Sequence, residues 1–103
     1  KKNRVDKKTI GKIFKEGRFV NSPNLTFKFI KTNDERRISF IAPKTISKKA
    51  VIRNLLRRRG YIILKKYFNK LPVGVAGVFI FKKYQDDVSI IENEIKNILN
   101  KIN

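Results

Sequence analysis

The sequence contains no cysteine and no histidine among its 103 residues. Their absence excludes disulfides, zinc sites built on Cys or His, a histidine general base and a thiol nucleophile. No Gly-x-x-x-x-Gly-Lys phosphate loop occurs, and no apolar run approaches the roughly 20 residues of a membrane span. There is also no secretory signal pattern. We therefore expect a cytoplasmic protein with one domain over residues 1–103 and no membrane partner.

Acidic residues are scarce: 8 Asp and Glu stand against 26 Lys and Arg, which gives a formal charge of +18. From Arg36 to Gln85 there are fourteen Lys or Arg and no carboxylate. Such a stretch cannot neutralise itself through internal ion pairs, and it repels itself unless it meets a polyanion. This charge favours nucleic-acid binding, in which basic residues release counterions from phosphates. The alternative is a solvated charged face, which ordinarily mixes both signs.

The close carboxylate pairs of the sequence are Asp34–Glu35 and Asp86–Asp87. Adjacent loop residues point apart, and acidic residues at turns and helix starts ordinarily serve as caps. We therefore interpret both pairs as structural. The sequence predicts no catalytic residue on this chain, which weighs against a free-standing nuclease.

Hydrophobic periodicity over the first half of the chain predicts one helix and two strands. The helix covers 7–16, with Asp6 as its N-cap. Alternating side chains predict strands over 25–30 and 37–42, with a polar turn between them. We expect these two strands to pair as an antiparallel hairpin.

The second half predicts a long helix over 48–69, a fully apolar central strand over 75–81 and a last helix that begins after Asp86 or Asp87. The order α-β-β-α-β-α around one sheet belongs to the α+β class. Five phenylalanines are expected in the core of the sheet: Phe27, Phe29, Phe40, Phe79 and Phe81.

The long helix is predicted to be amphipathic at 100° per residue. Its apolar arc would contain Val51, Ile52, Leu55, Leu56, Ile62 and Ile63. Arg53 and Arg57 lie four residues apart on the other side, where guanidinium groups can bind phosphate oxygens in pairs. A basic amphipathic helix can also lie on an anionic membrane, which the apolar strand after it disfavours. Phe14 and Tyr61 are candidates to stack on unpaired bases.

The run 49–54 (Lys-Ala-Val-Ile-Arg-Asn), followed by Arg57 and Arg58, resembles the RNR signature of the bacterial ribonuclease P protein component. Asn3-Arg4-Val5 before the first helix and Pro43-Lys44 before the basic helix occur in matching order, so the resemblance covers nearly the whole chain. The sequence departs from the family at Leu55, where an arginine is common, and at Gly60–Tyr61, where another basic residue is usual.

The resemblance implies an α-β sandwich with a mixed sheet whose long helix forms a left-handed β-α-β crossover. It implies a subunit of ribonuclease P that binds the catalytic RNA and the 5′ leader of precursor tRNA, with no protein partner. Cleavage and its Mg²⁺ would belong mainly to the RNA. The residues that would face the RNA subunit are Lys48, Lys49, Arg53, Asn54, Arg57 and Arg58. Those that would contact the leader are Phe14, Lys28 and Tyr61.

A small basic ribosomal protein that binds rRNA is the alternative, since it would share the charge and the lack of cysteine. The Arg53-Asn54-x-x-Arg57-Arg58 cluster, followed by an apolar strand, favours ribonuclease P, because rRNA binding in general does not require that arrangement.

Overall fold

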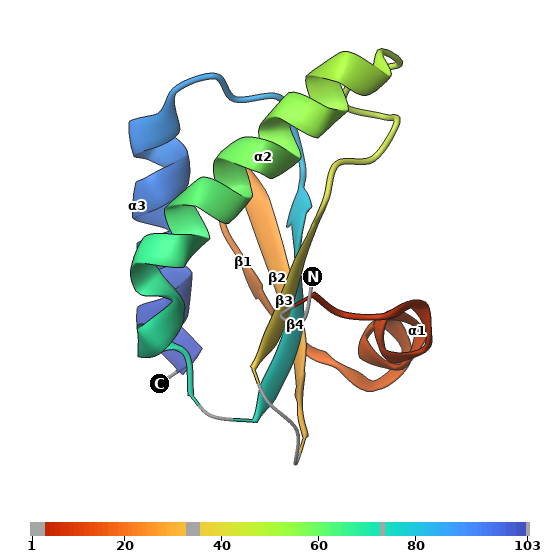
Figure 1. Cartoon of the computed structure of the whole chain (residues 1–103), viewed down its shortest axis with the longest axis vertical. Helices are drawn as coiled ribbons and strands as arrows, with labels where there is room; N and C mark the ends of the chain where they lie inside the picture. The colour runs from red at the N-terminus through yellow and green to blue at the C-terminus, as the bar shows by residue number, and fades with distance from the viewer. Residues whose placement is uncertain (1–3, 33–35, 73, 103) are drawn as a thin grey trace.

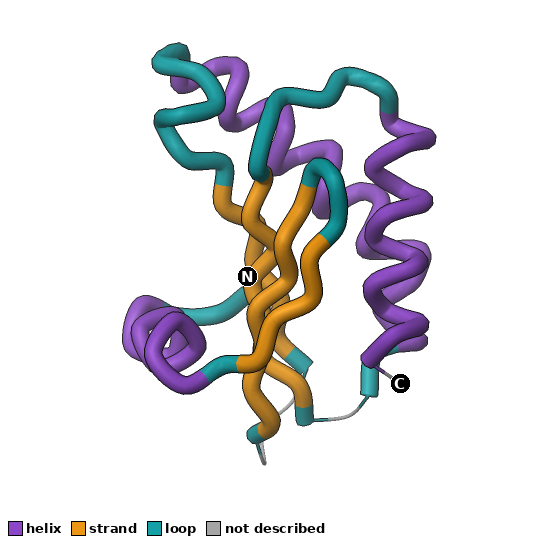
Figure 2. Tube along the Cα trace, turned by 180° about the vertical axis from the view of Figure 1, so that it is seen from behind, coloured by secondary structure: helices purple, strands orange, loops and turns teal. Residues whose placement is uncertain are grey.

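The computed structural model describes residues 4–32, 36–72 and 74–102. Within them a four-stranded sheet lies between α1 on one side and α2 with α3 on the other (Figures 1 and 2). The α+β class and the positions of the three helices are confirmed, whereas β1 was not predicted. The elements are α1 (Lys7–Glu16), β1 (Arg18–Asn21), β2 (Leu25–Lys31), β3 (Arg37–Ile41), α2 (Ala50–Tyr67), the short 3₁₀ turn η1 (Phe68–Lys70), β4 (Val75–Phe81) and α3 (Val88–Ile102).

The strands lie in the order β1-β2-β4-β3. β2 is antiparallel to both β1 and β4, and β3 is parallel to β4. The predicted hairpin between 25–30 and 37–42 is therefore wrong, because β4 lies between those two strands. A strand that is apolar on both faces is buried best in the middle of the sheet. α2 joins the parallel pair, so a β-α-β unit is present, and the left-handed sense of its crossover stays a prediction.

Aromatic rings form the centre of the core between the sheet and the helices α2 and α3. The register places Phe27 of β2, Phe79 of β4 and Phe40 of β3 directly beside one another. The ring centroids are 4.4 Å apart for Phe27 and Phe79, and 5.0 Å apart for Phe79 and Phe40. All five phenylalanines expected in the core are buried, as predicted.

The side of α2 that faces the sheet differs from the predicted apolar arc. Leu56, Gly60, Ile63 and Leu64 are the buried residues of this helix, whereas Val51 and Ile62 are 76% and 60% exposed. The helix is rotated because its backbone approaches β3 at Gly60. A Cβ atom at this position would lie 2.5 Å from ring carbons of Phe40, so only glycine allows the contact.

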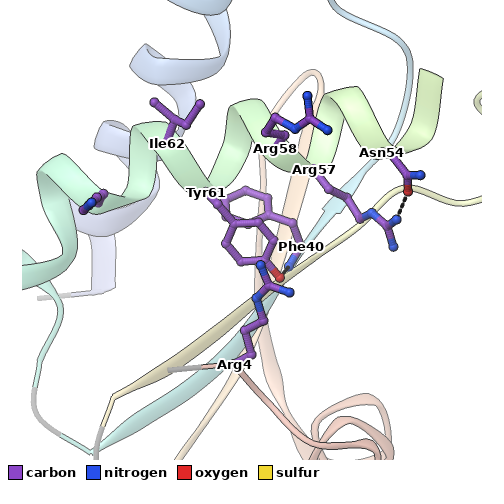
Figure 3. A pocket seen from close by; sticks show the side chains of 8 residues that line it. Arg4, Phe40, Asn54, Arg57, Arg58, Tyr61 and Ile62 are labelled. Carbon is purple, nitrogen blue, oxygen red and sulfur yellow. Dashed lines mark hydrogen bonds between the residues drawn. The ribbon is translucent and has the colours of Figure 1, made fainter. Parts of the chain in front are cut away.

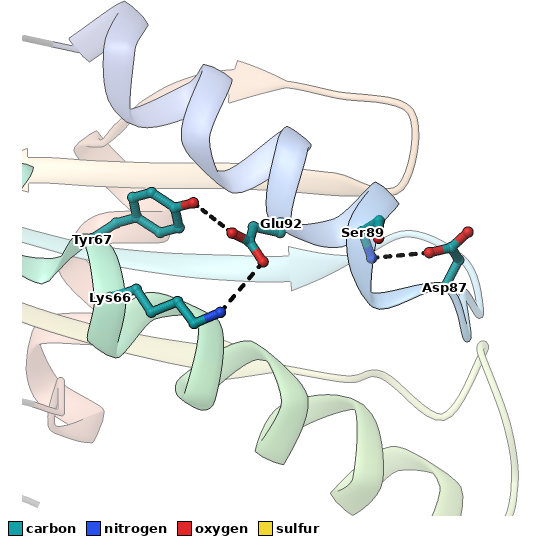
Figure 4. Close-up of polar contacts among 5 residues, drawn as sticks. All are labelled: Lys66, Tyr67, Asp87, Ser89 and Glu92. Atoms are coloured by element: carbon teal, nitrogen blue, oxygen red, sulfur yellow. Dashed lines mark hydrogen bonds and ion pairs between the residues drawn. The ribbon is translucent and has the colours of Figure 1, made fainter.

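Two carboxylates cap helices as predicted. Asp6 accepts a hydrogen bond from the backbone N–H of Thr9 at 2.8 Å, and the hydrogen bonds with Thr9 hold the pKa of Asp6 below its ordinary value. Asp87 accepts one from the backbone N–H of Ser89 at 2.9 Å at the start of α3 (Figure 4). The other predicted pair, Asp34–Glu35, lies outside the described residues.

Two further carboxylates attach α3 to the rest of the domain. Glu94 is buried and accepts hydrogen bonds from the Ser22 hydroxyl and from the amide and backbone N–H groups of Asn24, the latter at 2.8 Å. It therefore holds the turn between β1 and β2. Glu92 accepts from the Tyr67 hydroxyl at 2.5 Å and lies 3.8 Å from the Lys66 ammonium (Figure 4). The hydrogen bond with Glu92 raises the pKa of Tyr67.

Gly60→Ala is expected to destabilise the domain although alanine is the better helix former. Propensity favours alanine by about 1 kcal/mol, but overpacking against the buried Phe40 ring costs about 1–3 kcal/mol. Urea unfolding should show a net loss of up to about 2 kcal/mol. Gly11→Ala in α1 is the control, since apart from the adjacent residues and backbone of its own helix no atom lies within 4 Å of its new Cβ. That variant should gain stability, and equal gains in both would contradict the packing of α2 on β3.

Candidate nucleic-acid interface

A hollow of about 530 Å³ lies where α2 and β3 meet the segment that precedes α1 (Figure 3). Four cationic side chains and one amide line it, together with aromatic and aliphatic surface, and none of its lining residues is acidic. A concave site with this charge attracts anions. We call it the α2 hollow; its lining residues are Arg4, Phe40, Asn54, Arg57, Arg58, Tyr61, Ile62 and Lys65.

Within the α2 hollow, the Arg4 side chain lies over the ring of Tyr61. The guanidinium carbon of Arg4 lies 4.2 Å from the centroid of the Tyr61 ring. The Tyr61 hydroxyl in turn accepts a hydrogen bond from the backbone N–H of Phe40 at 3.1 Å. Next to Arg4, the backbone N–H of Val5 donates to the Ser39 hydroxyl at 2.8 Å. Both members of the stack are therefore held by β3.

The structure gathers only part of the predicted RNA-binding set at the α2 hollow. Asn54, Arg57 and Arg58 are exposed there, and Arg57 donates to the Asn54 side-chain oxygen (Figure 3). Arg53 is half-buried, and its guanidinium donates to the Ser47 carbonyl at 2.8 Å, so it braces the turn before the helix.

The start of α2 forms the other part of the basic surface. Lys48 and Lys49 are exposed and directly precede the helix, whose first turn contains no acidic residue. Because a helix N-terminus is already positive, acidic residues are favoured there and lysines are not. Unpaired N–H groups and two ammonium groups at this end suit a phosphate.

A second set of side chains lies on the opposite side of the sheet, beside α1. Phe14 is 44% exposed, and the Lys28 ammonium lies 4.9 Å from the centroid of its ring. Phe19 of β1 is directly opposite Lys28 in the register and is 62% exposed. We call Phe14, Phe19 and Lys28 the open face. Tyr61, predicted to act with Phe14 and Lys28, belongs to α2 and lies on the other side of the sheet.

Phe19 is the residue of the open face that the sequence analysis missed. Its strand has only four residues, and only one of them is half-buried. Such a strand lacks the alternation of apolar and polar side chains by which a strand is recognised in a sequence. The available indication was its position between Gly17, which ends α1, and the Ser22–Pro23 turn. A short run bounded in this way is typical of an edge strand.

The carboxylates of the described residues are unsuited to a resident metal ion. No group of three or more His, Cys, Asp or Glu that could hold a metal occurs in the described part of the chain. Asp6, Asp87, Glu92 and Glu94 are each engaged with protein donors. Within the described residues, these side chains therefore do not form a divalent-cation site. Within the same residues, no helix is long and apolar enough to cross a membrane.

The fold is similar to solved structures of two bacterial proteins. The RNase P protein from Thermotoga maritima superposes with a TM-score of 0.86 at 23% identity, and the match covers 97% of each chain. The RNase P protein from Staphylococcus aureus gives 0.83 at 18% identity and covers 99% of this chain and 96% of that one. No curated protein sequence matches the chain significantly.

The sequence family model described as Ribonuclease P matches residues 1–103, which is the whole chain. A ribosomal protein would not account for this match. The chain belongs to the ribonuclease P protein family, whose members are subunits of an RNA-based holoenzyme that processes the 5′ end of tRNA.

Proposed function

We propose that this chain joins the catalytic RNA of ribonuclease P to precursor tRNA by binding one of them on each side of its sheet. The observation that carries the proposal is the separation of two surfaces, the α2 hollow and the open face, by a single four-stranded sheet. A formal charge of +18 allows one small domain to lower the repulsion between two polyanions.

The catalytic RNA is assigned to α2. Arg57 and Arg58 present cations on the helix, and Lys48 and Lys49 add two more directly before its start. Asn54 adds an amide that can contact a sugar or a base edge. Arg53 supports this surface indirectly by holding the turn that carries the two lysines. We also place Tyr61 on this surface, because it lines the α2 hollow.

The 5′ leader is assigned to the open face. A leader is single-stranded, and unpaired bases stack on aromatic rings while their phosphates meet a cation. Phe14 and Phe19 supply two exposed rings, and Lys28 supplies an ammonium group next to both. Hydrolysis and the Mg²⁺ that drives it are assigned to the RNA, because the family acts in an RNA-based holoenzyme.

The first test is cleavage of precursor tRNA at low magnesium by the ribonuclease P RNA that is cognate to this protein. Adding the protein should restore correct removal of the leader, because the basic surfaces lower the repulsion that magnesium otherwise screens. Protein without the RNA should leave the substrate intact. Cleavage by the protein alone, or no rescue with the cognate RNA, would contradict the proposal.

Arg57→Ala should weaken binding of the catalytic RNA and lower the slope of log K against log salt by about one, because each phosphate contact releases about one counterion. Lys96→Ala is the matched control, since it also removes one exposed cation from a helix but lies on α3. Binding titrations over several salt concentrations measure both slopes. Equal slopes for the two variants would remove Arg57 from the interface.

Phe14→Ala should weaken binding of precursor tRNA to the holoenzyme by roughly 5- to 100-fold, as expected for one lost stacking contact. Binding of mature tRNA, which lacks the leader, should not change. Ile90→Ala serves as the control, because this residue is similarly exposed but belongs to α3. An equal loss for both tRNAs would show that Phe14 contacts another part of the substrate.

A further inference from the structure

We propose that the α2 hollow binds one unpaired nucleotide, whose base stacks on the outer face of the Arg4 guanidinium and whose flanking phosphates contact Arg57 and Lys65. The inference rests on the proposed function in taking RNA as the partner of α2. It adds the class of RNA group that enters the hollow. The family signature does not imply a stacking site in the hollow, because the ring beneath Arg4 belongs to Tyr61, which stands where another basic residue is usual.

The Arg4 guanidinium lies over an aromatic ring and is open to solvent. Its central carbon is 4.2 Å from the centroid of the Tyr61 ring, and the residue as a whole is exposed, so a base can approach the guanidinium from the solvent side. Hydrogen bonds of Tyr61 with Phe40 and of Val5 with Ser39 hold the two sides of the stack. Guanidinium planes stack on nucleobases, and a guanidinium that already rests on an aromatic ring loses less entropy on binding than one that is free in solution.

Cations lie on both sides of this plane along the same helix. Arg57, Tyr61 and Lys65 are spaced by four residues, so they share one side of α2 with the tyrosine in the middle. Eight residues of helix separate Arg57 from Lys65 by about 12 Å, and their long side chains can reach inward to consecutive phosphates. Arg57 and Lys65 both line the hollow, and Figure 3 shows Arg57 on the same helix as Tyr61, with Arg4 next to the tyrosine.

The shape of the site favours an unpaired nucleotide over a double helix. The hollow has a volume of about 530 Å³, within the range of roughly 300–1,000 Å³ found for small-molecule and cofactor sites. A second hollow of about 560 Å³ shares Arg4, Tyr61 and Lys65 with it and is also lined by Phe68 and Asn69. A base inside a double helix cannot present its face to a side chain, because its neighbours in the stack cover it on both sides. A base outside the stack can lie on Arg4.

The test uses a short single-stranded oligoribonucleotide containing 2-aminopurine, a fluorescent base whose emission falls when it stacks, and the same strand within a duplex. Both are titrated with the full chain in a Phe14→Ala, Phe19→Ala, Lys28→Ala background, which removes all three side chains of the open face. The decisive variant is Arg4→Lys, which keeps the charge but removes the plane. Arg18→Lys is the matched control, because Arg18 is equally charged and exposed but belongs to β1.

The fluorescence of the single strand should be quenched on binding. Arg4→Lys should abolish this quenching and weaken the affinity of the protein for the single strand by roughly 5- to 100-fold. The duplex affinity and the salt slope should not change, and Arg18→Lys should alter neither probe. Absence of quenching in the background variant, or equal weakening of single strand and duplex by Arg4→Lys, would overturn the inference. The cleavage assay tests the proposed function separately. A negative titration therefore contradicts only the nucleotide site, and a negative cleavage assay contradicts the proposed function.

Discussion

Contact among three aromatic rings in the middle of the sheet determines how the other elements are placed. Phe27, Phe79 and Phe40 occupy one register row on β2, β4 and β3, and their stacking holds β4 between its two partners. The outer ring of the row, Phe40, also fills the space left by Gly60, which sets the distance and rotation of α2. Tyr61 follows Gly60 directly, so the same packing places the α2 hollow at the edge of β3.

The sequence was sufficient to predict the helices and the buried strands, because their apolar residues recur with the periods of a helix and a strand. It was not sufficient to predict which strands are neighbours. Alternation in β2 and β3 indicates which side chains face the core, but not that a strand from beyond α2 inserts between them. The rotation of α2 was missed for a related reason, because glycine carries no hydrophobic signal although Gly60 makes the closest contact with the sheet.

The candidate site also has one aspect that the sequence predicts and another that depends on the three-dimensional arrangement. The types of residue were predicted from charge, since a long stretch without carboxylates identifies the basic helix. Their grouping depended on the topology: Phe14 and Lys28 meet on one side of the sheet, whereas Tyr61 belongs to the other. Arg53 has the chemistry of a phosphate ligand but bonds to a carbonyl of its own chain. Periodicity places a side chain on a helix face but does not identify its partner.

The contact of the Tyr61 hydroxyl with the Phe40 backbone has a consequence for the solubility of the complex. β3 is an edge strand, and the free N–H groups of an edge can pair with another copy of the chain. In the isolated protein, a charge of +18 keeps copies apart. Bound RNA cancels that repulsion. In the complex, pairing between the β3 edges of two copies must therefore be prevented by side chains that cover the edge. Tyr61 occupies one N–H of β3, and Arg4 and Val5 lie against the same strand, which obstructs aggregation through this edge in the neutralised complex.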